Sequence, residues 1–144
     1  MRDSRYDVLF EPVRIGPKVA PNRFYQVPHC AGSAGSEQPG FQSELRGMKA
    51  QGGWGVVCTE YCSIHPTSDD SPYVSARLWD DDDAANLSVM CDRIHAFGSL
   101  AGAELWHGGF QSKNSESRHV RIGPLQGPSD LYVGNYARYA DAED

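Results

Sequence analysis

Three short apolar runs alternate with segments of helical spacing along the chain. The first run, residues 24–27, is rich in aromatic and β-branched residues, which favour strands. The second, residues 54–59, is almost continuously apolar and bounded by glycines, a pattern typical of a strand buried on both faces. The third covers residues 99–106. We therefore predict three strands, the first of them short and buried.

The segments between these runs change to a period near 3.6 residues. From residue 41 to the glycine pair at 52–53, Phe41, Leu45 and Met48 recur at i, i+4 and i+7, which predicts an amphipathic helix with these residues buried. Residues 80–98 begin with four aspartates, which stabilise a helix amino terminus, and end at a glycine. The apolar positions of this second helix are Leu87, Met90, Cys91, Ile94 and Phe97.

The resulting order β-α-β-α-β predicts a parallel sheet with right-handed crossovers. Residues 1–21 are expected to be extended, with a hairpin turn at residues 16–17. Residues 63–79 are expected to form a long loop, and residues 110–144 show no clear period. Three strands do not close a (β/α)₈ barrel, which needs eight units and about 250 residues. A small open sheet is the alternative, but no further strand completes it, so we interpret the chain as truncated.

Composition narrows the class of partner. The 144 residues suffice for one domain, and the net charge of −6 disfavours nucleic acid or an anionic membrane as partner. No apolar run approaches the ~20 residues of a membrane span, and the first seven residues are too charged for a signal peptide. A cytoplasmic location is the default expectation.

The four cysteines do not form a disulfide framework by spacing. They are Cys30, Cys58, Cys62 and Cys91. The Cys58-x-x-x-Cys62 pair lacks a second pair and the usual zinc spacing, so buried reduced thiols are the better interpretation and no metal site is predicted.

Polar residues follow or end each predicted strand, at residues 28–30, 59–61 and 104–107. Because neighbouring parallel strands end at the same edge, these three stretches are expected to converge on one rim. An active site and ordinary polar loops both fit this pattern. No glycine-rich phosphate loop of the Rossmann or P-loop type is present.

Several motifs carry a resemblance to a known family. They are Asn-Arg-Phe-Tyr-Gln-Val-Pro-His-Cys at 22–30, Pro-Gly-Phe-Gln-Ser at 39–43, Gly-Gly-Trp at 52–54, Thr-Glu-Tyr-Cys-Ser-Ile at 59–64, Ser-Ala-Arg-Leu-Trp-Asp at 75–80, Leu-Ala-Gly-x-Glu-Leu-Trp at 100–106 and Glu-Ser-Arg at 116–118. The chain resembles the trimethylamine dehydrogenase group, the flavin- and iron–sulfur-containing amine dehydrogenases of the old yellow enzyme family. The cysteine after Pro-His separates this group from ordinary ene reductases.

The resemblance implies that the chain is the N-terminal portion, about three βα units, of an incomplete (β/α)₈ TIM barrel that binds FMN at its carboxyl face. Cys30 is then expected to carry the flavin as a thioether at ring carbon 6. Pro28 and His29 are expected to line the ring. Glu104 matches a position at the pyrimidine edge of the flavin.

The resemblance also implies a substrate site. Tyr61 matches an aromatic wall whose π face holds an alkylated ammonium ion by cation–π attraction, worth ~0.5–2 kcal/mol. A tyrosine here favours trimethylamine over dimethylamine by analogy with the group. Trp106 either adds to this pocket or closes the core. His107 stands where the group pattern has a tyrosine, which puts the identity of the amine in question.

The rest of the enzyme is expected outside residues 1–144: the catalytic acid–base residues, the iron–sulfur and nucleotide-binding domains and the cysteines of a [4Fe–4S] cluster. The implied partners are a small amine and an electron-transferring flavoprotein, and the implied assembly is a homodimer. Dimethylamine or histamine oxidation is the first alternative, and an NAD(P)H-dependent ene or dienoyl reductase the second. A non-catalytic truncated chain, unable to bind FMN stably by itself, is the alternative of another class.

Overall fold

The computed structural model describes residues 3–31, 39–70, 76–124, 127–128 and 136–139. In chain order the elements are η1 (Ser4–Phe10), β1 (Val13–Ile15), β2 (Lys18–Ala20), β3 (Tyr25–Gln26), α1 (Pro39–Gln51), β4 (Val56–Ser63), η2 (Pro66–Ser68), β5 (Ala76–Arg77), α2 (Asp81–His95), β6 (Leu100–Trp106), η3 (Gly109–Gln111), β7 (Ile122–Gly123), β8 (Gly127–Pro128) and β9 (Tyr136–Tyr139). The expected order of three strands and two helices is confirmed, with β3, β4 and β6 as the strands.

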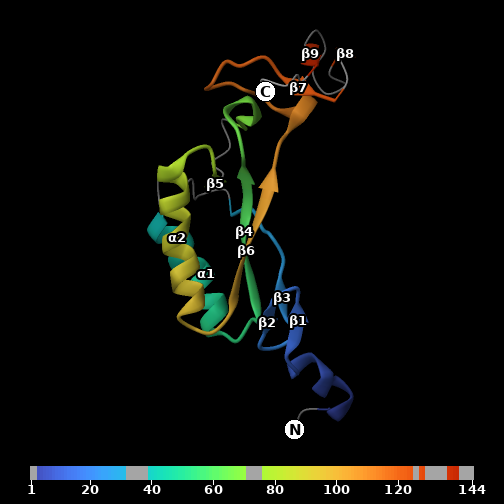
Figure 1. The fold of residues 1–144 in the computed structure, drawn as a ribbon, viewed down its shortest axis with the longest axis vertical. Coiled ribbons are helices and arrows are strands. Elements are labelled where there is room, and N and C mark those ends of the chain that lie inside the picture. Colours follow the sequence, from blue (N-terminus) through green and yellow to red (C-terminus); the bar gives the residue numbers. More distant parts are fainter. Residues whose placement is uncertain (1–2, 32–38, 71–75, 125–126, 129–135, 140–144) are drawn as a thin grey trace.

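Strand β4 is the centre of a parallel sheet. β6 pairs with it along its whole length, from Val56↔Leu100 to Ser63↔Trp106. β3 pairs with the start of β4 and β5 with its end, so these two short strands share the other edge. All three neighbours run parallel to β4, as the βαβ order predicts. The carboxyl ends of β4 and β6 therefore lie side by side (Figure 1).

Both helices cover the same face of the sheet (Figure 1). The core on that face joins Ala50 of α1, Val57 of β4, and Met90 and Ile94 of α2, each at most 3% exposed. On the opposite face the hairpin β1–β2 packs its Ala20 against Val56 and Cys58 at the start of β4. The predicted hairpin with its turn at residues 16–17 is thus confirmed, and its position closes the amino end of the sheet.

Helix α2 agrees with its sequence pattern except at Phe97, which lies after the helix and is 37% exposed, whereas α1 buries a different face from the one predicted. The Asp80 side chain accepts a hydrogen bond from the Asp83 amide and caps α2, which buries Leu87, Met90 and Ile94. In α1 the expected buried residues Phe41 and Met48 are instead 45% and 60% exposed. The face of α1 that is buried carries mostly polar or small residues: Gln42, Ser43, Arg46, Gly47 and Ala50.

Close contact and a polar neighbour explain the reversed face of α1. At Gly47 an added Cβ would lie 2.6 Å from the Cγ of Arg93 on α2, so the two helices approach where a larger residue does not fit. The preceding residue, Arg46, is fully buried and reaches the segment that follows β3. The pattern of three apolar residues correctly predicted a helix but indicated the wrong side of it.

The first predicted strand is shorter and less buried than expected. β3 has two residues, and Tyr25 and Val27 are 49% and 62% exposed, whereas Gln26 is buried. Among the described residues β3 pairs with β4 alone, so one of its edges has no neighbouring strand there.

Other boundaries also differ from the expectation. β4 continues to Ser63, so Glu60 and Tyr61 lie within the strand and not after it. The 3₁₀ helix η1 occupies residues expected to be extended, η2 and β5 lie in the expected loop 63–79, and a small sheet of β7, β8 and β9 lies in the stretch without clear period. Within the described residues, no helix combines the length and apolar character that a membrane crossing requires.

Candidate active site at the carboxyl rim

The segment that follows β3 is held by two buried charged side chains. The Nη2 group of Arg46 on α1 donates a hydrogen bond to the carbonyl oxygen of His29. The Glu60 Oε2 atom on β4 accepts a hydrogen bond from the Ala31 amide at 3.0 Å. Both side chains are 0% exposed, and Cys30, which lies between the two contacts, is exposed.

Arg46 has further acceptors under this segment. Its Nε donates to Gln42 Oε1 at 3.2 Å and its Nη1 to Gln26 Oε1 at 3.4 Å. Burial lowers the pKa of the Arg46 guanidinium, and attraction to the Glu60 carboxylate opposes that change. The guanidinium thus stays paired in an environment that penalises an isolated charge.

The three aromatic and acidic residues predicted for the site share one face of the sheet. Cys62 packs against Leu87 of α2, so the preceding Tyr61 points to the face opposite the helices. Glu104 is the register partner of Tyr61, and Trp106 lies two residues further on the same strand. The Tyr61 and Trp106 rings are 4.9 Å apart between centroids and tilted by 48°. The structure thus brings Tyr61 and Trp106 together, with the exposed Glu104 on the same face.

A carboxylate meets the hydroxyl end of this aromatic pair. Tyr61 Oη donates a hydrogen bond of 2.6 Å to Asp70 Oδ2. The phenol oxygen is therefore directed to Asp70, and the ring of Tyr61 leans against Trp106. The half-buried Trp106 contacts Tyr61 and is the last residue of β6. This position is compatible with a role in the pocket and with a role in closing the core.

Two histidines at the same rim are joined through a threonine hydroxyl. The Gly109 amide donates to His107 Nδ1 at 3.0 Å, so His107 Nε2 carries the proton and donates to Thr67 Oγ1 at 3.0 Å. Thr67 Oγ1 then donates to His65 Nδ1 at 2.8 Å. Burial and, to a smaller extent, His65 lower the pKa of His107. His107 is thus a neutral, fixed side chain next to Trp106 in the chain.

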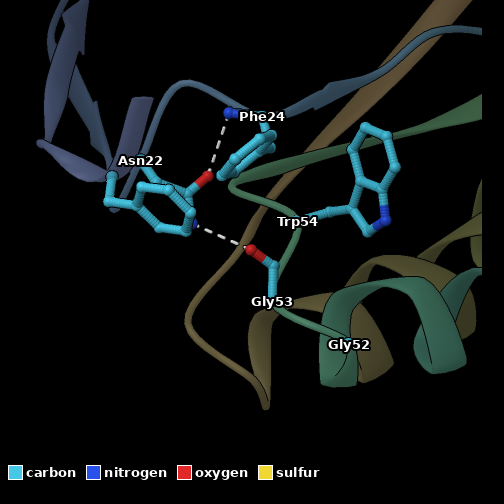
Figure 2. Close-up of a pocket in the computed structure, with 6 residues that line it drawn as sticks. Asn22, Phe24, Gly52, Gly53 and Trp54 are labelled. Carbon is cyan, nitrogen blue, oxygen red and sulfur yellow. Dashed lines mark hydrogen bonds between the residues drawn. The ribbon is translucent and has the colours of Figure 1, made fainter. Parts of the chain in front are cut away.

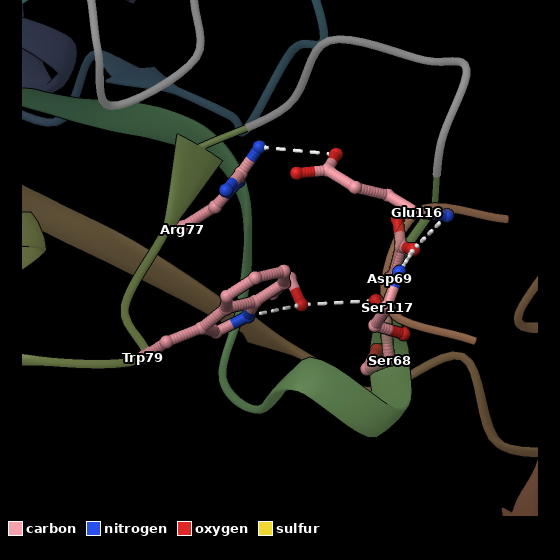
Figure 3. Close-up of polar contacts among 7 residues, drawn as sticks. Ser68, Asp69, Arg77, Trp79, Glu116 and Ser117 are labelled. Carbon is pink, nitrogen blue, oxygen red and sulfur yellow. Dashed lines mark hydrogen bonds and ion pairs between the residues drawn. The ribbon is translucent and has the colours of Figure 1, made fainter. Parts of the chain in front are cut away.

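A second group of contacts ties the loop after β6 to the loop after β4 (Figure 3). The buried Asp69 carboxylate accepts hydrogen bonds of 2.8 Å from the amides of Glu116 and Ser117. Arg77 lies over the Trp79 ring at 4.6 Å and pairs with Glu116 at 3.4 Å. These contacts hold the rim loops together.

The opposite, amino end of the sheet has a cavity of different character (Figure 2). Its volume is about 550 Å³, and its walls include Phe10, Phe24 and Trp54. Asn22 donates to the Gly53 carbonyl and accepts from the Phe24 amide, so its side chain is used in the fold. None of the residues predicted for the site lines this cavity.

The remaining cysteines fit the interpretation as reduced thiols. Cys58 and Cys62 are buried without a disulfide, and burial raises the pKa of the Cys62 thiol. Within the part of the chain that the structure describes, no group of three or more His, Cys, Asp or Glu side chains is arranged to hold a metal ion.

Comparison with known proteins identifies a family and several relatives that share this sequence and architecture. Residues 8–142 match the model of the NADH:flavin oxidoreductase / NADH oxidase family. Dimethylamine dehydrogenase of Hyphomicrobium sp. (strain x) is 52% identical over 130 residues, which cover 90% of this chain and 18% of the dehydrogenase.

Two solved structures share the fold closely. Histamine dehydrogenase from Rhizobium sp. 4-9 has a TM-score of 0.90 and 43% identity, covering 99% of this chain and 22% of that one. The 6-hydroxypseudooxynicotine amine oxidase from Pseudomonas geniculata N1 has a TM-score of 0.89 and 38% identity, covering 99% of this chain and 21% of that one. This chain therefore spans about a fifth of the length of these relatives.

The chain belongs to the NADH:flavin oxidoreductase / NADH oxidase family. Its fold is the N-terminal part of a TIM barrel, as expected from the sequence, and the described sheet is not closed. Of the three relatives described above, two are named as amine dehydrogenases and one as an amine oxidase.

Sequence reasoning missed Arg46, Gln42 and the buried role of Glu60. The spacing of Gln42 and Arg46 at i and i+4, beside the small residues Ser43, Gly47 and Ala50, was the available signal. It was overlooked because a polar stripe on a helix ordinarily faces solvent.

Proposed function

We propose that the chain is the first part of a flavin-dependent amine dehydrogenase. Residues 1–144 form the N-terminal part of its FMN-binding barrel domain, and the iron–sulfur and nucleotide-binding domains belong to sequence outside this chain. The observation that carries the proposal is the exposed Cys30 at the carboxyl rim, beside strands that present Tyr61, Glu104 and Trp106 on one face.

The rim residues fit an FMN. The thiol of Cys30 is exposed for attachment as a 6-S-cysteinyl thioether, and Pro28 and His29 lie in the segment that the buried Arg46 supports. The exposed carboxylate of Glu104 is available for the N–H of a pyrimidine edge. FMN, when bound, supplies the acceptor for the two electrons lost by the amine.

The substrate class we propose is a small alkylated amine. Tyr61 and Trp106 offer π faces to an alkylated ammonium ion, an attraction worth ~0.5–2 kcal/mol. Trimethylamine is the first candidate because residue 61 is a tyrosine, which favours trimethylamine over dimethylamine by analogy with the group. Its oxidation gives an iminium, which water hydrolyses to dimethylamine and formaldehyde.

Dimethylamine is the second candidate, and histamine the third. The Asp70 carboxylate next to the Tyr61 hydroxyl offers an acceptor that a protonated secondary amine, with two N–H groups, is able to use. The relative that is 52% identical is a dimethylamine dehydrogenase. In each case we propose that electrons continue to a [4Fe–4S] cluster and an electron-transferring flavoprotein, in a homodimer located in the cytoplasm.

Anaerobic mixing of the full-length gene product with each amine tests this function. We expect trimethylamine to bleach the flavin absorbance and to yield formaldehyde. Bleaching by NAD(P)H, with transfer to an activated alkene and no response to any amine, would support the reductase instead. A gene product that ends at residue 144 and binds no FMN would support the non-catalytic chain.

The Tyr61→Gln variant tests the assignment of the aromatic wall. Loss of the ring removes the cation–π contact, so we expect kcat/KM for trimethylamine to fall about twofold to thirtyfold relative to dimethylamine. The matched control is Tyr6→Gln, because Tyr6 is 54% exposed on η1 at the other end of the chain. An unchanged ratio of kcat/KM for the two amines in Tyr61→Gln would remove Tyr61 from the pocket.

A further inference from the structure

The two peptide groups on either side of Cys30 are both fixed by side chains from distant elements. The His29 carbonyl belongs to the peptide before Cys30, and Arg46 holds it from α1. The Ala31 amide belongs to the peptide after Cys30, and Glu60 holds it from β4 at 3.0 Å. With both flanking peptide planes fixed, the φ and ψ of Cys30, and hence the direction of its Cα–Cβ bond, have little freedom.

The cost of this arrangement indicates that it serves more than packing. Arg46 and Glu60 are both 0% exposed, and a buried charge costs free energy unless hydrogen bonds and nearby opposite charge compensate for it. The Glu60 Oε1 atom is buried with no hydrogen-bond partner in the described residues, so the carboxylate makes its one direct contact there through Oε2. Two buried charged side chains thus hold the Cys30 segment, which has no regular secondary structure.

The charges also match the groups they hold. A guanidinium donates to a carbonyl and a carboxylate accepts from an amide, and such charge-assisted bonds are roughly twice as strong as neutral ones. Gln42 and Gln26 in turn fix the Arg46 fork at 3.2 and 3.4 Å. The Cys30 backbone is therefore supported by a connected set of side chains from β3, α1 and β4.

We propose that Arg46 and Glu60 are positioning residues that set the direction of the Cys30 thiol for covalent attachment of the flavin. This inference rests on the proposed function. Attachment replaces the S–H bond and one ring C–H bond with an S–C bond; two protons leave, and two electrons pass to an oxidant, for which dioxygen in aerobic culture suffices. A misdirected thiol slows this step because the reacting atoms must lie close together and in line.

The experiment compares variants of the full-length protein, harvested at fixed times after induction. The intact mass of the acid-denatured protein gives the fraction of chains with attached flavin, and total flavin per chain is measured before denaturation. We expect Glu60→Ala and Arg46→Ala to keep flavin bound but to attach it about tenfold to a hundredfold more slowly. Glu60→Gln retains an acceptor oxygen and is expected to restore most of the attachment rate.

Two controls and one replacement variant separate positioning from folding. Met48→Ala, on the exposed side of the same helix, is expected to attach flavin at the wild-type rate. Cys30→Ser is expected to bind FMN without attaching it. If Arg46→Ala does not fold, Arg46→Lys replaces it, because a lysine keeps the charge but cannot reach the three acceptors in a fork.

Amide hydrogen exchange gives an independent readout in protein without flavin. A peptide that contains residue 31 is expected to exchange faster in Glu60→Ala than in wild type or Met48→Ala, because the Ala31 amide has lost its acceptor. Wild-type attachment rates in Glu60→Ala and in the arginine variant, or a parallel loss of bound and attached flavin, would overturn the inference. A wild-type protein without attached flavin would instead contradict the proposed function.

Discussion

Helices α1 and α2 cover the same face of one sheet but bury opposite kinds of side chain. α2 buries Leu87, Met90 and Ile94 and begins at an aspartate cap, as its sequence predicts. α1 buries Gln42, Ser43 and Arg46 and leaves Phe41 and Met48 exposed. The difference lies in what each helix contacts: both pack on the core and on each other, and within the described residues α1 also contacts the segment that carries Cys30. Buried polarity on α1 therefore indicates the candidate site.

Arg46→Ala tests this difference most strongly. It leaves the Glu60 carboxylate buried without its counter-charge, so we expect the free energy of unfolding of the full-length protein to fall by about 3–5 kcal/mol. Urea denaturation measures the loss. Arg46→Met is the matched apolar replacement, and a loss below 1 kcal/mol in Arg46→Ala would show that the contacts of Arg46 carry no weight.

Ile94→Ala is the corresponding change on α2. Ile94 is 0% exposed among Met90, Val57 and Ala50, so the change leaves a cavity and we expect a loss of about 2–5 kcal/mol. The flavin attachment rate should remain that of wild type, because Ile94 contacts the core and not the Cys30 segment. Val89→Ala, at a position that is 45% exposed on the same helix, is the control. Slower flavin attachment in Ile94→Ala would show that α2 also influences the Cys30 segment, against the proposed difference between α1 and α2.

The half-buried Cys91 on α2 is expected to make the stability of the fold depend on pH in the alkaline range. Burial, more than the neighbouring Asp92, raises the pKa of Cys91 above its ordinary value of 9.0. The unfolded chain therefore loses the thiol proton first, so stability is intact below pH 9.0 and declines as the pH rises through the folded-state pKa. Cys91→Ala should show a smaller decline above that pH in thermal melts. Cys62, whose thiol pKa is raised by burial too, contributes equally to both proteins.

Met48→Gln should have the smallest effect. Met48 is 60% exposed on α1 although the apolar spacing indicated burial, so we expect a change within about 0.5 kcal/mol. A loss of 2 kcal/mol or more in urea denaturation would mean that the apolar side of α1 is covered in the full-length protein.

Periodicity and turn residues were sufficient to predict the order of the hairpin, the three main strands and the two helices, because a buried strand such as β4 and a capped helix such as α2 leave strong local patterns. The hairpin, β4, α2 and β6 follow from residues close in sequence. The buried face of α1 does not, because it depends on Gln26, His29 and Glu60, which other elements supply. Likewise β3 and the length of β4 depend on pairing between strands.

In the candidate site, too, some features were predictable from the sequence and others were not. Convergence of Tyr61, Glu104 and Trp106 at one edge followed from the parallel order of the strands, and their shared face is observed. Their roles toward flavin and amine stay predictions. The His107–Thr67–His65 chain was missed because His65 comes from a loop whose path the spacing does not define.

The mass of the Cys30 peptide from the full-length protein tests the central claim most directly. After acid denaturation and removal of free flavin, the claim predicts that the peptide containing Cys30 carries the mass of one FMN, less two hydrogens. A Cys30 peptide of unmodified mass, with all flavin released into the acid supernatant, would contradict it.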